Sequence, residues 1–92
     1  PLGAPPPPRA PADVEVRLLG PADGAALDRV ADGVFDHPVD PRWARAFLDD
    51  PRHHLAVAVD RAADPAGVVV GMASAVDYVH PDKAPQLWIN EV

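Results

Sequence analysis

An acidic residue lies within an apolar stretch at the end of the chain, "LWINEV", Leu87 to Val92. Alternate side chains of an extended strand share a face, so Glu91 is predicted to share its face with Leu87 and Ile89. Asn90 and Val92 then point the other way. A carboxylate on an apolar face loses hydration and becomes a better proton acceptor, which makes Glu91 a candidate general base. The alternative is an acid at a strand edge that meets solvent or a partner arginine.

The residue types and their spacing do not favour a thiol nucleophile, a metal site or a catalytic triad. The chain has no Cys, so it has neither a thiolate nucleophile nor a disulfide. His53 and His54 are adjacent in a predicted strand and therefore point to opposite faces, which prevents them from sharing one metal ion easily. No metal site is predicted. We find no Ser–His–Asp arrangement and no Gly-rich phosphate loop.

The elements that must position Glu91 are mostly strands. Alternating apolar residues in "VEVRLL" predict a half-buried strand over 14–19, which Gly20-Pro21 ends. "HHLAVAVD" predicts a strand over 53–60, and "GVVVGMASAVDYV" predicts a longer one over 67–79. The short turn between these two strands favours an antiparallel hairpin. A last strand is predicted over 86–92, in which Trp88 packs under the helices on the face opposite to Glu91.

Two helices are predicted between the first strand and the second. Leu27, Val30, Ala31 and Val34 have the spacing of one helical face and predict a helix over 21–33. Asp40 is a good N-cap and Pro41 suits the first helical position, so a second helix is predicted from there to about Asp49. Trp43 and Phe47, four residues apart in this helix, are predicted to be core residues.

The composition fits one small domain. The first twelve residues, "PLGAPPPPRAPA", predict a Pro-rich disordered leader or, alternatively, a docking peptide, and leave 13–92 as the domain. A net charge of -6 disfavours a nucleic-acid partner and suits a cationic one, although acidic surfaces also serve solubility. The longest apolar run, Ala66 to Val76, is too short to span a membrane. With no sign of secretion, a cytoplasmic location is expected.

The order strand, helix, helix and three meander strands resembles the N-terminal half of the GCN5-related N-acetyltransferase family. "VRLLGPADGAALDRVADGVF" is similar to the family's first strand and helix. "LAVAVDRAADPAGVVVGMASA", with its Val70-Gly71 pair, is similar to its second and third strands, and "LWINEV" to the start of its fourth. The stretch from Val69 to Val92 is most similar to the aminoglycoside 3-N-acetyltransferase type I branch, in which strand four carries an acid where this chain has Glu91.

The resemblance implies an α/β, mixed three-layer fold and acetyl-CoA as co-substrate. It implies that Glu91 acts as general base, that Val92 makes a main-chain contact to acetyl-CoA, and that the acceptor pocket is lined from two sides. These substrate-binding candidates are Asp36, Asp77, Tyr78, His80 and Asn90. An ordinary polar loop is the alternative for residues 77–80, and a cap or turn role is the alternative for Asp36. The family's phosphate-binding loop would follow strand four, where this sequence stops.

Together these observations predict the N-terminal part of a bacterial N-acetyltransferase. It would transfer acetyl to a primary amine of a small cationic acceptor, such as an aminoglycoside, by direct attack. The 92 residues alone are expected to be inactive, and a homodimer or a complementary C-terminal segment is the expected protein partner. The rival hypothesis is a non-catalytic binding or assembly module with half an acetyltransferase fold. A third possibility, which the open strand edge at Val92 favours, is that the chain is one fragment of a cleaved or partly disordered protein.

Overall fold

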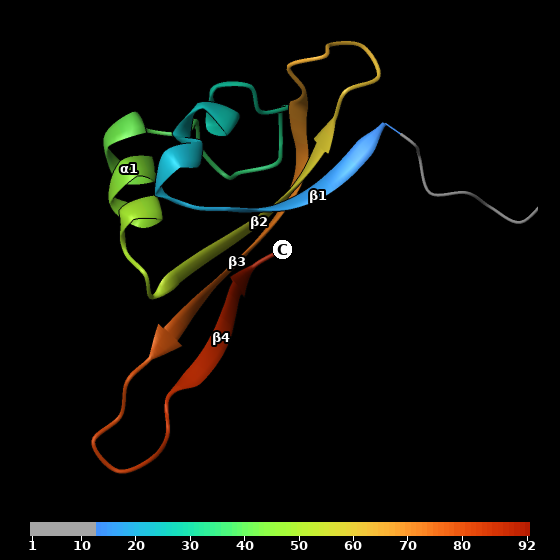
Figure 1. The fold of residues 1–92 in the computed structure, drawn as a ribbon. Helices are drawn as coiled ribbons and strands as arrows, with labels where there is room; N and C mark the ends of the chain where they lie inside the picture. Colours follow the sequence, from blue (N-terminus) through green and yellow to red (C-terminus); the bar gives the residue numbers. More distant parts are fainter. Residues whose placement is uncertain (1–12) are drawn as a thin grey trace, which may run out of the picture.

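A computed structural model describes residues 13–92 (Figure 1), so the predicted leader over 1–12 lies outside the described residues. Four strands form one antiparallel sheet in the order β1-β2-β3-β4. The elements are β1 (Val14–Leu19), the 3-10 helix η1 (Pro21–Asp28), α1 (Pro41–Asp49), β2 (His53–Asp60), β3 (Val68–Tyr78) and β4 (Gln86–Glu91). The predicted mixed α/β character is confirmed. The described residues form two layers, and the third layer of the predicted fold is not among them.

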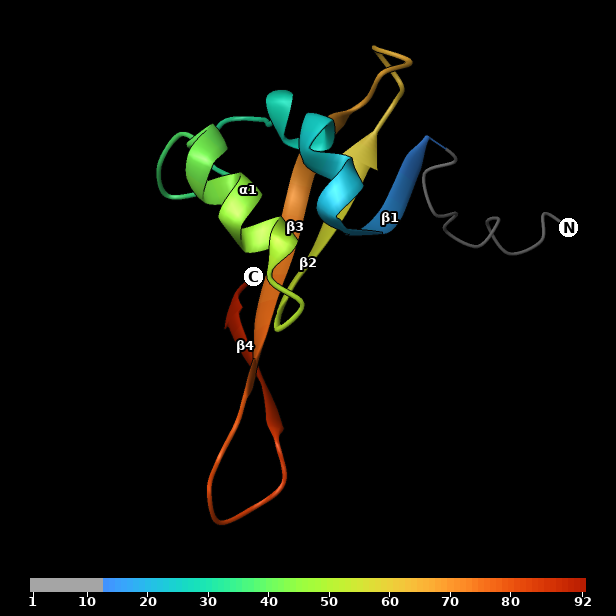
Figure 2. The same cartoon turned by 60° about the vertical axis from the view of Figure 1, so that its left-hand side comes forward.

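Both helices lie on the same face of the sheet, as Figures 1 and 2 show from two directions. Residues paired across an antiparallel ladder point to the same face. Leu19 pairs with Leu55, and Val57 pairs with Met72, so these side chains all face the helices. The core lies between the two layers. It comprises Leu19, Leu27, Leu48, Leu55, Val57, Val59 and Val69.

The opposite face of the sheet is open among residues 13–92. Val16 and Leu18, predicted to lie on the buried side of the first strand, are 75% and 76% exposed there. The register explains the difference, because the Leu19–Leu55 pair turns Arg17 and Leu19 toward the helices instead. Arg17 is tolerated on that face because its guanidinium pairs with Glu15 and Asp23 at the margin of the core.

The first helix is shorter and tighter than predicted. It ends at Asp28, with a kink at Asp23, and Arg29 is already extended. The chain then pairs with β3: Val30 forms an isolated parallel bridge to Val69, supported by hydrogen bonds from Ala31 N to Val69 O and from Val69 N to Arg29 O, both 2.9 Å. Backbone pairing with the sheet therefore replaces the last predicted turns of helix.

The second helix has the predicted bounds, and Asp40 caps it by accepting a 2.8 Å hydrogen bond from Arg42 N. Leu48 is buried, and the Phe47 ring stacks on His53 with 4.9 Å between centroids, which fixes α1 to β2. Trp43 is 73% exposed, so its prediction as a core residue is wrong. The helix rests on the sheet only along the Ala44, Phe47 and Leu48 side, and the indole projects beyond it.

Candidate functional site

A β-bulge near the end of β4 determines which way Glu91 points. Ile89 pairs with Ala75, but Glu91 pairs with Ser74, so Asn90 is an extra residue in the ladder. Neighbouring residues of β3 point to opposite faces, and the bulge therefore puts Glu91 on the helix-bearing face with Ser74. The prediction that Glu91 shares a face with Ile89 is wrong, because a strict alternation does not allow for the extra residue.

The same register shift places Trp88 on the helix side, opposite Val76. The prediction that Trp88 lies opposite to Glu91 and packs under the helices is therefore wrong on both points. Its side chain is 53% exposed and meets the Tyr78 ring edge-on, with 6.1 Å between centroids. All six residues of β4 are exposed, because η1 and α1 cover the other end of the sheet.

Glu91 lines a cavity of about 340 Å³ between the helical layer and the sheet. The helical layer and its connecting loop supply apolar walls, from Leu27, Phe35, Pro38, Val39, Trp43, Ala44 and Phe47. The sheet supplies the floor, from Leu55, Met72 and Ser74. In Figure 2 the end of β4, marked C, lies beside β3 on the side that α1 covers. The cavity is thus apolar inside, with its carboxylates on one loop and one strand end.

Three carboxylates line this cavity, and one of them is already paired. Asp40 binds the Arg42 guanidinium, with 3.0 Å between Oδ2 and Nη2, and this hydrogen bond lowers the pKa of the Asp40 carboxyl from its ordinary value. Asp36 and Glu91 have no ion-pair partner within residues 13–92. Both side chains are exposed, so the predicted desolvation of Glu91 on an apolar face is not found in the described part of the chain.

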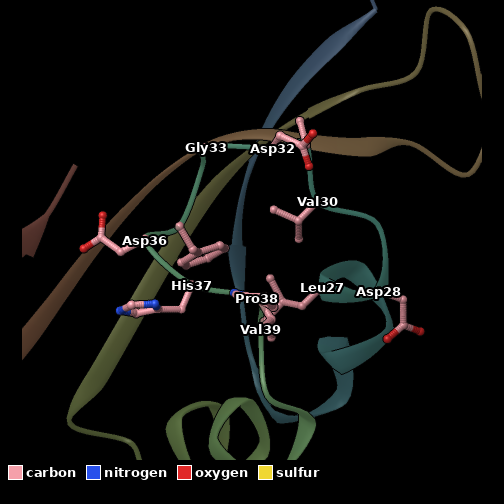
Figure 3. A pocket seen from close by; sticks show the side chains of 11 residues that line it. Leu27, Asp28, Val30, Asp32, Gly33, Asp36, His37, Pro38 and Val39 are labelled. Atoms are coloured by element: carbon pink, nitrogen blue, oxygen red, sulfur yellow. The ribbon is translucent and has the colours of Figure 1, made fainter.

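The loop that carries Asp36 also encloses a second cavity of about 450 Å³. Figure 3 shows Asp36 and Asp28 on opposite sides of this loop, pointing away from each other, with His37 next to Asp36. Val30, Leu27 and Val39 lie between them. Asp36 and His37 line both cavities, but Glu91 lines only the one beneath α1. The cavity beneath α1 therefore brings together the predicted base and one predicted acceptor ligand.

The other predicted acceptor residues lie elsewhere. Asp77 is on the open face of the sheet, where its Oδ2 is 3.0 Å from His54 Nε2. Tyr78 ends β3 and contacts Trp88. His80 follows in the β3–β4 loop, and its Nε2 is buried without a hydrogen-bond partner in residues 13–92. None of these three lines the Glu91 cavity.

Asn90 and Val92 flank Glu91 without lining the cavity. Val92 is 96% exposed beyond the end of β4. His53 pairs with Val76 and His54 with Ala75, so the two rings point to opposite faces as predicted. Within residues 13–92 no three His, Asp or Glu side chains are grouped so as to hold a metal ion. No helix in this part of the chain is long and apolar enough to cross a membrane.

Trp43 lines the Glu91 cavity, and the sequence analysis did not predict this. Its helical spacing with Phe47 indicated a core position. The same spacing gives no indication that Trp43 lies beside a cavity. Phe35 and Met72, which also line the cavity, belong to an irregular loop and to the middle of a strand. No protein-family model, curated protein or solved structure gives a significant match to this chain.

Proposed function

We propose that this chain provides the acceptor-binding part of an N-acetyltransferase that transfers acetyl from acetyl-CoA to a primary amine. The observation that carries the proposal is the bulge at Asn90, which turns Glu91 into the same cavity as Asp36. Two carboxylates that have no ion-pair partner in residues 13–92 line this apolar cavity, and such groups attract an ammonium group. A carboxylate in contact with that group is also placed to accept its proton.

In the proposed reaction, the ammonium first loses a proton to Glu91, directly or through a water molecule. The amine nitrogen then attacks the thioester carbonyl carbon, a C–N bond forms, the C–S bond breaks and coenzyme A leaves as a thiolate that is then protonated. Acetyl-CoA supplies the thioester, and Asp36 holds the amine in position. Residues 13–92 contain no phosphate-binding loop, so the proposal requires other residues for the coenzyme side.

The contact predicted for Val92 fits within this proposal. β4 pairs with β3 along one side, and its other edge has no strand partner in the described part of the chain. The free backbone N–H and C=O groups of such an edge are available to an extended amide-containing ligand. Val92, at the end of this edge, is where we place a main-chain contact to the pantetheine arm.

The test uses this chain purified together with the residues that the proposal requires for the coenzyme side. It is native mass spectrometry with acetyl-CoA, followed by an assay of coenzyme A release with a primary amine. The proposal predicts a bound acetyl-CoA adduct and an amine-dependent release that Glu91→Gln reduces by about 100-fold or more. If the protein retains no acetyl-CoA and releases no coenzyme A with any amine, the acetyltransferase proposal fails.

A second candidate is a non-catalytic assembly module, and the open face of the sheet favours it. Small residues fill the middle of that face, and larger apolar ones stand on the two outer strands. The outer residues are Val16, Leu18, Leu87 and Ile89, each at least 61% exposed. An apolar face of this kind is a typical surface for another polypeptide. Leu18→Lys together with Ile89→Lys would abolish a partner complex detected by light scattering, and would leave amine binding in the cavity intact.

A further inference from the structure

The walls of the Glu91 cavity restrict the acceptor more narrowly than its charge does. Nine of the fourteen residues that line the cavity are apolar. Of its polar groups, Ser74 is 6% exposed, and Asp40 is already bound by Arg42. Apart from Asp36, His37 and Glu91, the cavity therefore offers few hydrogen-bond partners for a hydroxylated molecule. A buried hydroxyl group without a partner is costly, whereas a hydrocarbon body gains by leaving water.

The size of the cavity gives an independent restriction. A volume of about 340 Å³ is near the lower end of the range for small-molecule pockets, which is about 300–1,000 Å³. One ring with a short aliphatic chain fills such a volume, whereas a molecule built of several sugar rings would extend out of it into solvent. The available space and the apolar walls thus favour the same kind of acceptor.

Trp43 supplies the feature that selects for an organic amine. Its indole is 73% exposed on α1, yet it lines the same cavity as Asp36 and Glu91. An exposed indole face binds a cation and stacks on an aromatic ring, and carboxylates beside it bind the ammonium that the ring carries. Burial in the core does not explain the position of this side chain, because Leu48 and Phe47 attach α1 to the sheet.

We propose that the acceptor is a small amine with an apolar, aromatic body, an arylalkylamine, and that Trp43 is the residue that selects it over a polyhydroxylated aminosugar. The ammonium lies between Asp36 and Glu91, and the ring lies against Trp43 and Phe47. This inference rests on the proposed function for the fate of the amine, but amine binding itself needs no acetyl-CoA and is measured without it.

The experiment is an NMR titration of the ¹⁵N-labelled protein with 2-phenylethylamine, 2-phenylethanol and glucosamine. The two tryptophans give two indole N–H signals, and Trp88, outside the cavity, is the internal control. We expect 2-phenylethylamine to shift the Trp43 signal and leave the Trp88 signal in place, with a Kd at least tenfold below those of the alcohol and the aminosugar. Glucosamine binding as tightly as 2-phenylethylamine would overturn the proposal.

Substitutions show which side chains bind the amine. Trp43→Ala is expected to weaken 2-phenylethylamine binding about tenfold or more, and Trp43→Phe to restore most of it, whereas Trp88→Ala leaves it unchanged. Asp36→Asn is expected to weaken binding similarly, and Asp49→Asn, the same charge change outside the cavity, is not. Unchanged binding in Trp43→Ala, with the remaining signals showing a folded protein, would remove Trp43 from the site.

Amine binding and coenzyme A release are measured separately, so the acceptor class and the acetyltransferase activity can each be wrong alone. If 2-phenylethylamine binds as expected and the protein that includes the coenzyme-binding residues releases no coenzyme A with it, the acetyltransferase proposal fails and the binding site stands. If coenzyme A is released with glucosamine and not with 2-phenylethylamine, the acetyltransferase proposal stands and the inferred acceptor class is wrong.

Discussion

Glu91 lies opposite Ser74, on the face of the sheet that carries the helices, because Asn90 is an extra residue in the β3–β4 ladder. In a regular ladder Asn90 would take the place opposite Ser74, and Glu91 would point to the open face. The position of the proposed base therefore depends on one irregularity of the backbone.

NMR contacts of Glu91 in the unchanged protein test this relationship, and a variant that lacks Asn90 is the reference. Without the extra residue, Glu91 directly follows Ile89 and becomes the regular partner of Ser74, so it stays on the helix-bearing face. We expect NMR contacts from Glu91 to Ser74 in both the deletion variant and the unchanged protein. Contacts from Glu91 to Ala73, on the open face, in the unchanged protein would contradict the observed register.

Two residues of α1 are expected to differ strongly in their effect on stability. Trp43 is 73% exposed and Leu48 is 6% exposed. Trp43→Ala should change the free energy of unfolding by no more than about 0.5 kcal/mol, as is usual for surface positions. Leu48→Ala should lower it by about 2–5 kcal/mol, because it opens a cavity under the helix. Urea denaturation measures both, and a loss from Trp43→Ala as large as that from Leu48→Ala would place the indole in the core.

The two glycines with positive φ provide a matched comparison. Gly33 (φ 82°) and Gly67 (φ 85°) both adopt a conformation that disfavours L-residues, at a cost of about 1–2 kcal/mol. A Cβ at Gly33 would meet nothing within 4 Å, whereas one at Gly67 would lie 2.4 Å from Val59 Cγ1.

We therefore expect Gly67→Ala to be more destabilising than Gly33→Ala by about 1–3 kcal/mol, the usual cost of overpacking. The free energies of unfolding of the two variants, measured in the same buffer, check this. Equal losses would mean that the β2–β3 turn relaxes without resistance from the core.

Acid stability depends in part on Asp50. Hydrogen bonds from the Arg52 side chain and backbone lower the pKa of the Asp50 carboxyl from 3.8 to about 2. A carboxyl whose pKa is lowered by folding stabilises the protein above its unfolded-state pKa and loses that contribution as the pH falls. The loss from Asp50 is thus expected between about pH 4 and pH 2.

Asp50→Asn removes this contribution. The variant should be less stable than the unchanged protein at pH 7, and the difference should shrink as the pH falls through that range. Thermal melts at pH 7, 4 and 2 measure it, with Asp49→Asn as the control. A difference that stays constant from pH 7 to pH 2 would assign the effect to something other than the Asp50 charge.

Local patterns predicted most of the elements correctly. Asp40 and Pro41 fixed the start of α1, because the capping side chain and the preset φ of proline act on the nearest residues. The alternation of Leu55, Val57 and Val59 predicted β2 and its buried face. Such features depend on residues that are close in sequence, so they can be predicted from one sequence.

The failures concern contacts between distant residues. The spacing of Leu27, Val30 and Ala31 suits a helix, but the backbone of Val69 offers hydrogen bonds that draw residues 29–31 to the sheet. The bulge at Asn90 cannot be recognised from the alternation of side chains along a strand. The alternation pattern therefore assigned Glu91 to the wrong face, and its position beside the cavity results from the bulge.

The residues predicted to line one acceptor pocket do not all lie together. Asp36 lines the cavity with Glu91, but Asp77 lies on the other face of the sheet, in contact with His54. The face on which Asp77 lies is set by strand register, which depends on pairing partners that are distant in sequence. The exposure of Trp43 depends similarly on where α1 sits on the sheet.

The most direct test of the proposed function is coenzyme A release from acetyl-CoA with 2-phenylethylamine, by the purified protein that includes the coenzyme-binding residues, compared with its Glu91→Gln variant. We predict amine-dependent release that falls by about 100-fold or more in Glu91→Gln, while a saturating concentration of 2-phenylethylamine still shifts the Trp43 indole signal. Equal release by the two proteins, or no release by either when the amine is bound, would contradict the role assigned to Glu91.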